Sequence, residues 1–164
     1  HYLMPRETIG LPGERNEVLH DSPLGVGLLS TAGESFENVL LAATTAILMG
    51  NVVVLPSTLV GENVADVLHR AGIPTGVARV VPGSTEELLQ QLDVDFAVAH
   101  GRFGQAVHQA LIGKRRRRTG FARFIGGFDQ PEDPRYLTNF AYETVRTERT
   151  LHHGVDLDLR EVLG

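Results

Sequence analysis

The chain contains neither cysteine nor tryptophan, and acidic residues outnumber basic ones. Without cysteine, a disulfide framework, a thiolate metal site and a cysteine nucleophile are all excluded. No apolar run approaches the ~20 residues that span a bilayer, so we expect no membrane association. The net charge of −5 disfavours a nucleic-acid partner, because such proteins usually carry an excess of basic residues.

What remains is the composition of a globular domain: 164 residues, of which 42% are apolar and 21% charged. The first residues lack the apolar core of a signal peptide, so we expect a cytoplasmic protein. Changes in composition along the chain predict three parts. These are an extended N-terminal arm at 1–22, a Rossmann-like domain at 23–130, and a linker with a C-terminal β-arm at 131–164.

Strand and helix patterns alternate through the middle of the chain. Short apolar runs predict strands at 25–29, 52–55, 77–81, 96–99 and 121–125. Helices are predicted at 35–49, at 59–71, after Ser84 or Thr85, and at 103–114. Continuous apolar strands are buried on both faces. The fold class is therefore α/β, with a doubly wound, mostly parallel Rossmann-like sheet that has helices on both faces.

The pattern changes after Gly127. Residues 142–150 alternate small or apolar side chains with charged ones, which predicts an exposed strand. Gly154 could turn the chain back along a second strand to form a hairpin, and such a ribbon is marginal alone in water. We therefore expect a protein partner, or self-association, through this C-terminal β-arm by strand addition. The predicted interface residues are Tyr142, Val145, Val155, Leu157 and Leu159.

Five short motifs occur in a characteristic order. They read PGERN at 12–16, PLGVG at 23–27, LMGNVVV at 48–54, AGIPTGV at 71–77 and VVPGS at 80–84. This series resembles the NAD-binding domain of the aldehyde dehydrogenase superfamily without the catalytic domain that follows it there. The chain is also similar to the C-terminal aldehyde-dehydrogenase-like domain of long proline utilization A proteins. Those domains keep the Rossmann fold, have lost activity, and carry an oligomerization flap.

The departures from the family concern its chemistry. The resemblance places Gly33 where the family has its active-site asparagine and Phe124 where it has its glutamate base. Leu55 and Thr58 fall on the lysine and glutamate that grip the adenosine ribose. Because the nucleophilic cysteine is also absent, the resemblance implies no catalytic residues here, and none is assigned from the residues themselves.

Four residues remain as candidates for cofactor binding: Gly101, Arg102, Gly104 and Ser57. The glycines bracket a shortened version of the family's cofactor turn, and Ser57 lies within the degenerate ribose motif. Arg102 follows a strand at the start of a helix, where anions bind, but a structural arginine explains it more simply. Loss of the ribose-binding side chains argues against any cofactor, while NAD stays open. No metal site is predicted.

A basic run at 114–118 is compatible with a polyanion site, but a solvated or partner-facing surface explains it more simply. The first functional hypothesis is therefore a non-catalytic domain that acts as a lid, bridge or oligomerization element in an oxidoreductase complex. The alternative is a degenerate NAD- or nucleotide-binding domain that needs a partner's catalytic domain for dehydrogenase activity.

Overall fold

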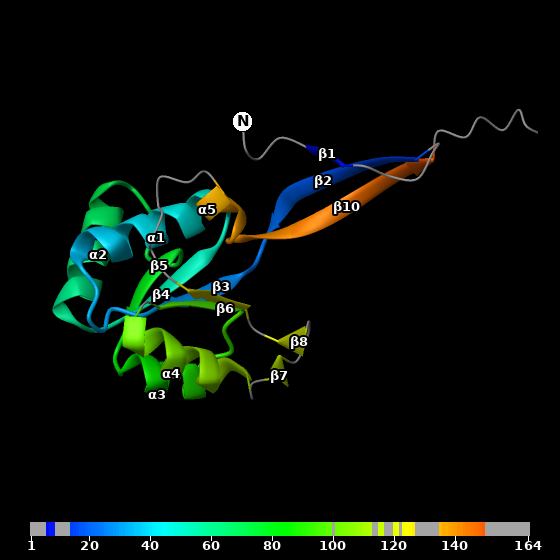
Figure 1. Cartoon of the computed structure of the whole chain (residues 1–164). Coiled ribbons are helices and arrows are strands. Elements are labelled where there is room, and N and C mark those ends of the chain that lie inside the picture. Colours follow the sequence, from blue (N-terminus) through cyan, green and yellow to red (C-terminus); the bar gives the residue numbers. More distant parts are fainter. Residues whose placement is uncertain are drawn as a thin grey trace, which may run out of the picture. The chain divides into compact units, whose positions relative to one another are not determined.

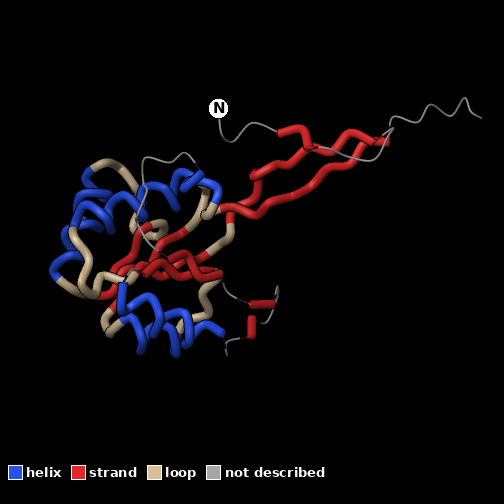
Figure 2. The backbone as a smooth tube through the Cα atoms, in the orientation of Figure 1, coloured by secondary structure: helices blue, strands red, loops and turns tan. Residues whose placement is uncertain are grey.

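A computed structural model describes residues 6–8, 14–99, 101–112, 115–116, 120–121, 123–126 and 135–149. The chain divides into two compact units. One unit comprises residues 22–142, and the other comprises residues 1–21 together with 143–164. Figure 1 labels the elements in chain order, and Figure 2 distinguishes helices from strands.

The larger unit is built on a five-stranded sheet in the order β5-β4-β3-β6-β9. All four strand pairings are parallel. The strands are β3 (Val26–Leu29), β4 (Val52–Pro56), β5 (Ala78–Val81), β6 (Phe96–Ala99) and β9 (Arg123–Gly126). Along the chain, β4 and β5 are added on one side of the central strand β3. Strands β6 and β9 are then added on its other side. The predicted doubly wound α/β fold is thus confirmed.

Helices cover both faces of this sheet, as Figure 2 shows. The covering helices are α1 (Phe36–Leu48), α2 (Leu59–Arg70), α3 (Thr85–Gln91) and α4 (Gly101–Ile112). Two apolar clusters result, one beneath α1 and α2 and the other beneath α3 and α4. Neighbouring residues of a strand point into different clusters, as Leu28 and Leu29 do. This is why the strands read as uninterrupted apolar runs.

Short hydroxyl side chains fix where three of these helices begin. Ser35, Thr58 and Ser84 are the N-caps of α1, α2 and α3, and each accepts a hydrogen bond from a backbone N–H of the first turn. Ser84 also forms a capping box with Glu87, whose carboxylate accepts from the Ser84 backbone at 2.8 Å. The third helix therefore starts after Ser84.

The segment after β9 contributes to the core. Helix α5 (Arg135–Thr138) carries Tyr136, and the turn after it carries Phe140; both side chains are buried. Phe140 packs edge-on against Phe96 at 5.8 Å and against Tyr136 at 5.3 Å between ring centroids. Residues 135–142, which the sequence pattern assigns to the linker and arm, therefore lie in the unit of the central sheet.

Tyr136 gives this core a sensitivity to alkali. Its hydroxyl has no hydrogen-bond partner among the described residues, and burial, with the charge of Glu34 as a smaller contribution, raises the pKa of the phenol. The unfolded chain releases this proton near pH ~10 while the folded chain retains it, so stability should fall above that pH. We expect Tyr136→Phe to lose less stability than the wild type between pH 9 and 11, measured by thermal unfolding. Equal losses would contradict this, and Tyr142→Phe, at an exposed tyrosine, is the matched control.

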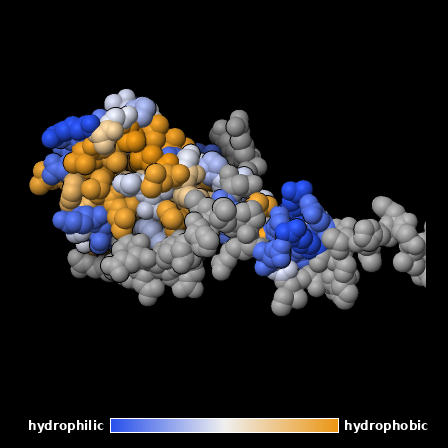
Figure 3. All heavy atoms as spheres, turned by 90° about the horizontal axis from the view of Figure 1, so that it is seen from above, coloured by the Kyte–Doolittle hydropathy of each residue, from blue (hydrophilic) through white to orange (hydrophobic). Residues whose placement is uncertain are grey.

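The smaller unit contains an antiparallel sheet in the order β1-β2-β10. Its strands are β1 (Arg6–Thr8), β2 (Glu14–Pro23) and β10 (Ala141–Arg149), of which β2 and β10 also extend into the larger unit. His20 lies 3.5 Å from the carboxylate of Glu143, and the Thr144 hydroxyl donates to the Leu19 carbonyl. Figure 3 shows hydrophilic side chains gathered on these strands.

The predicted strand at 142–150 exists as β10, but the neighbour that the structure gives it is β2. Part of the predicted extended N-terminal arm is thus a sheet strand, because alternation identifies a strand without naming its partner. The predicted returning strand, with Val155, Leu157 and Leu159, lies outside the described residues.

Two further differences concern the region after α4. The predicted strand at 121–125 is β9, which begins at Arg123, while Gly120–Phe121 (β8) pairs antiparallel with Arg115–Arg116 (β7). Part of the basic run therefore lies in a short two-stranded sheet. Within the described parts of the chain, no helix is both long and apolar enough to cross a membrane.

Candidate functional site

The candidate site is the edge of the central sheet where the strands end. Between β3 and β6 the strand order reverses, and open α/β sheets bind ligands in the crevice at this point. The residues that follow β3, β4, β5 and β6 must line such a site. They are the residues on which any cofactor function of this chain depends.

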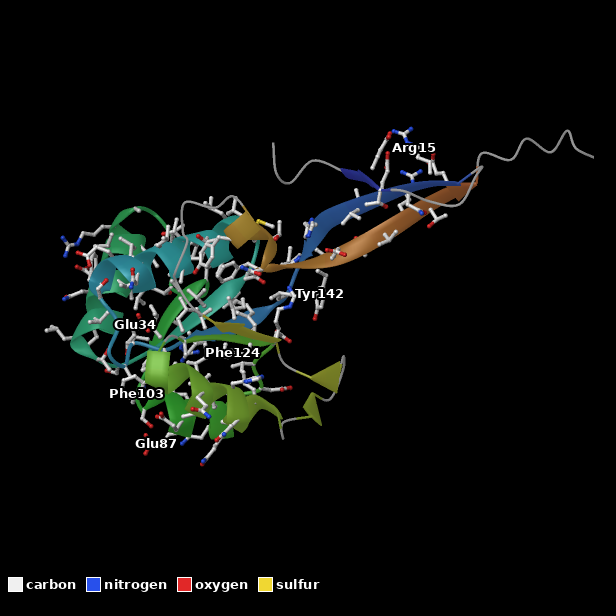
Figure 4. All side chains as sticks on the ribbon, viewed as in Figure 1. Arg15, Glu34, Glu87, Phe103, Phe124 and Tyr142 are labelled. Carbon is white, nitrogen blue, oxygen red and sulfur yellow. The ribbon has the colours of Figure 1, made fainter. Side chains whose placement is uncertain are left out.

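An aromatic ring lies against the loop after β3. Gly33 has φ +73°, and a Cβ built there would come within 2.8 Å of Cε2 of Phe103. The positive φ favours glycine at this position, and the Phe103 ring would have to shift to admit a Cβ. Figure 4 shows Phe103 at the start of α4. The resemblance places the family's active-site asparagine at Gly33, and the ring takes the space next to the backbone where that side chain would begin.

Hydroxyl groups from the neighbouring loops bond to one another. Thr58 donates to Thr31 at 2.9 Å, and Thr85 donates to Ser30 at 3.4 Å. Ser30, Thr31 and Thr85 are buried. These pairs connect the loop after β3 with the N-cap of α2 and with the first residue of α3. Sequence reasoning missed this network, because it depends on which loops the strand order brings together.

The side chains of the degenerate ribose motif have partners within the chain, and cofactor binding by Ser57 stays a prediction. The Leu55 side chain is fully buried in the core. The Thr58 hydroxyl is engaged with Thr31 and also accepts from the Gly61 backbone at 3.1 Å. Ser57, a predicted cofactor contact, donates to Oε1 of Glu62 at 2.7 Å. Both hydroxyls of this motif are thus hydrogen-bonded within the chain. The Thr58 hydroxyl caps α2, and the Ser57 hydroxyl bonds to Glu62 in the first turn of α2.

The glycine turn before α4 has a packing role at one of its two glycines. A Cβ at Gly104 would meet the Ala99 carbonyl oxygen and the ring of Phe124, each at 3.4 Å, so glycine lets α4 approach β6 and β9 closely. Gly101 and Arg102 form the first residues of α4. The Arg102 side chain lies outside the described residues, and cofactor binding by Gly101, Arg102 and Gly104 stays a prediction.

Phe124 forms part of an aromatic stack. Its ring lies 4.9 Å from that of exposed His108, with an interplanar angle of 24°. Phe124 also packs against the apolar cluster beneath α3 and α4, and Figure 4 shows it on β9. The resemblance puts the family's glutamate base here, and a phenyl ring can neither accept nor donate a proton.

Carboxylates lie at the positive ends of α1, α2 and α3, whereas the first turn of α4 has none. Glu37 lies in the first turn of α1, Glu62 in that of α2, and Glu86 and Glu87 in that of α3. Helix N-termini attract anions, and these side chains satisfy that preference within the chain. A pyrophosphate at the start of α1, α2 or α3 would meet negative charge. The sequence signal for this arrangement is a carboxylate two to four residues after a capping Ser or Thr.

Comparison with known proteins agrees with the fold and with the ordered motifs. A model of the aldehyde dehydrogenase family matches residues 3–112. A 1-pyrroline-5-carboxylate dehydrogenase from Geobacillus thermodenitrificans is 36% identical over 97 residues, which cover 56% of this chain and 18% of the relative. The chain thus spans less than a fifth of that relative.

Solved structures of low sequence identity share the fold. Proline utilization A from Bdellovibrio bacteriovorus superimposes with a TM-score of 0.60 at 21% identity, over 76% of this chain and 14% of that one. An NAD-dependent benzaldehyde dehydrogenase from Corynebacterium glutamicum gives a TM-score of 0.53 at 21% identity, over 76% of this chain and 28% of that one. The family's fold is therefore present in this chain.

Proposed function

We propose that this chain, which belongs to the aldehyde dehydrogenase family, performs no dehydrogenase chemistry itself and serves a structural or assembly role in an oxidoreductase complex. The observation that carries the proposal is the packing of side chains at the carboxyl ends of the strands. There Phe103 lies on Gly33, and the hydroxyls of Thr31 and Thr58 are bonded to each other.

The family's reaction needs a thiolate that attacks the aldehyde carbon and a base that handles the proton. The chain has no cysteine to supply the thiolate. Phe124 stands where the resemblance places the base, and its ring is stacked on His108. In this chain no cysteine can form the thiolate, and a phenyl ring occupies the position that the resemblance gives to the base.

The described residues do not fit the family's grip on NAD. Leu55 offers no hydrogen bond and is buried, Thr58 caps α2, and Ser57 is bonded to Glu62. The acidic residues at the N-termini of α1, α2 and α3 oppose a pyrophosphate at those positions as well. We therefore assign NAD no role in this chain. The alternative is a degenerate nucleotide-binding domain that depends on a partner's catalytic domain. It would require other side chains or backbone groups to bind the nucleotide.

The form of the smaller unit supports an assembly role. Its described residues form an antiparallel sheet, and no helix among them covers a face of that sheet. Sheets this small need a packing layer or additional strands to be stable. Val145, in the middle of β10, is 59% exposed. A partner that adds to this sheet would supply the missing contacts, and we place the partner surface on β10.

A titration with nucleotides tests the loss of cofactor binding. We expect no saturable heat with NAD, NADP, ATP or AMP at millimolar concentration by isothermal titration calorimetry. The Phe103→Ala variant distinguishes two causes of lost binding: steric obstruction by the ring, and the absence of ribose-binding side chains. If the ring were the sole obstacle, this variant would bind NAD; because the ribose-binding residues are absent too, we expect no binding. Saturable binding to the wild-type chain would favour the nucleotide-binding alternative.

Light scattering tests the assembly role. A chain that ends at Tyr142 keeps the buried residues Phe140 and Ala141 but loses most of β10. We expect the intact chain to assemble and this shortened chain to be monomeric. Leu59→Ser is the matched control, because it removes an apolar side chain that is 76% exposed on α2. Equal masses for the intact and shortened chains would rule out the arm as the assembly element.

A further inference from the structure

Strand β5 is an edge strand of the central sheet. It has β4 on one side, and none of the described strands lies on the other. The carbonyls of Val77 and Val81 accept hydrogen bonds from the β4 side, at 2.8 and 2.9 Å. Because backbone groups of successive residues point to opposite sides of a strand, Ala78 and Val80 turn theirs outward. Outward groups of this kind form a template to which another strand can add.

Both outward backbone groups of Ala78 already have partners. Its carbonyl oxygen accepts a hydrogen bond from Nε2 of His69 at 2.8 Å, and its N–H donates to the Pro74 carbonyl at 3.2 Å. A carbonyl oxygen only accepts, so Nε2 of His69 carries the proton. His69 lies in the last turn of α2, the helix beside β5 (Figure 1). A side chain of the covering helix thus takes the place of the donor that an added strand would supply.

We propose that His69 is a latch on this edge: its imidazole prevents β5 from pairing with β5 of a second copy of the chain. Proteins protect strand edges by keeping them short, by placing charge on them and by covering them with neighbouring elements. Strand β5 is four residues long and carries the exposed side chain of Arg79. The latch is the third of these devices. It involves the larger unit alone and is independent of the assembly role proposed for the arm.

The residues of β5 determine which pairing the latch opposes. Two copies related by a twofold axis pair through the same strand, antiparallel. An axis at Arg79 places Ala78 opposite Val80 of the other copy, whose N–H is then available to the Ala78 carbonyl. An axis at Val80 would place Ala78 opposite Pro82, which has no N–H to donate. The register about Arg79 is therefore the one that needs the carbonyl held by His69.

Arg79 opposes the same register by its charge. The two copies of this residue would face each other across the axis, and like charges directly opposite each other destabilise a strand pair. Replacing Arg79 with cysteine therefore removes the charge and at the same time reports the pairing. Facing Cα atoms of antiparallel strands lie roughly 4.5–5.5 Å apart, within the reach of a disulfide.

Cross-linking of the full chain tests the latch, because the natural chain has no cysteine of its own. Arg79→Cys alone should form disulfide-linked dimers slowly under mild oxidation, since His69 still holds the Ala78 carbonyl. Adding His69→Ala should raise the rate about two- to tenfold, which corresponds to one hydrogen bond of ordinary strength. Leu59→Cys, 76% exposed on α2, measures random collisions with and without His69→Ala.

Two further variants separate the hydrogen bond from the bulk of the imidazole. In the Arg79→Cys background, His69→Gln retains an amide N–H donor and should cross-link nearly as slowly as the chain with histidine. His69→Leu fills space without donating and should cross-link faster than His69→Gln. Equal rates for these two variants, or no rise with His69→Ala, would overturn the latch. An equal rise at Arg79→Cys and Leu59→Cys would also overturn it, because a loosened fold would then explain the effect.

Discussion

Replacing Asn51 with leucine should cost the larger unit about 3–5 kcal/mol of unfolding free energy. Asn51 is 2% exposed. Its Oδ1 accepts from the Gly25 N–H at 2.9 Å, and its Nδ2 donates to the carbonyls of Ala46 and Phe140 at 3.0 and 2.8 Å. The Ala46 carbonyl keeps a bond from the Asn51 backbone, so leucine orphans two groups, the Gly25 N–H and the Phe140 carbonyl. Urea denaturation measures the loss.

The Asn51→Asp variant separates the two sides of this amide. Aspartate retains an acceptor for the Gly25 N–H but turns a carboxylate toward two carbonyl oxygens. Its folded-state pKa should therefore lie above the ordinary ~3.9, and the penalty should grow as the pH rises above that value. Relative to the wild type, we expect Asn51→Asp to be much less stable at pH 7 than at pH 4. A pH-independent difference, or a loss below about 1 kcal/mol for Asn51→Leu, would contradict the role assigned to this side chain.

Asn51 also shows which features of the fold can be predicted from the sequence alone and which cannot. The Gly50–Asn51 pair is recognisable as the passage from a helix to a strand, since Gly50 has φ +83° after α1. The partner of the side chain, Phe140, lies 89 residues further on, and no local pattern connects them. For the same reason, residues 135–142 resemble a linker in sequence although Tyr136 and Phe140 are buried.

The central strands and helices could be predicted because each is encoded locally. Buried strands are apolar on both faces, and the helices carry hydroxyl caps and apolar stripes. Strand β10 was predictable from alternation, whereas its neighbour β2 was not, because pairing across more than a hundred residues leaves no local trace. Alternation in the sequence specifies which side chains share a face of the strand. It does not indicate which strand lies next to it.

The candidate site divides in the same way. The absent cysteine and the phenylalanine at position 124 are facts of the sequence, and their chemical consequence needs no structure. The contact between Phe103 and Gly33 depends on the loop after β3 meeting the start of α4. That meeting follows from the reversal of strand order between β3 and β6, so the fold had to be known first. The Ser57–Glu62 bond is local, but two neighbouring polar residues in a sequence do not reveal that they bond to each other.

A second large effect is expected at Gly61, in the first turn of α2. A Cβ there would lie 2.2 Å from the carbonyl oxygen of Pro56, a backbone atom at the end of β4. The helix must then shift away from the sheet and disturb the Thr58 cap, which bonds the Gly61 N–H at 3.1 Å. We expect Gly61→Ala to cost about 3 kcal/mol of unfolding free energy, at the upper end of overpacking penalties.

Two other glycines separate lack of space from backbone strain. Gly72 has φ +92°, and no heavy atom lies within 4 Å of the place that a Cβ would take, so Gly72→Ala should cost only the conformational strain, about 1–2 kcal/mol. Gly76 has neither a crowded Cβ position nor a positive φ, and Gly76→Ala should be neutral or stabilising by up to about 1 kcal/mol. The order of stability in urea should therefore be Gly76→Ala, Gly72→Ala, Gly61→Ala, from highest to lowest. If Gly61→Ala were as stable as Gly76→Ala, α2 would not be held against the end of β4 as closely as the contact with Pro56 requires.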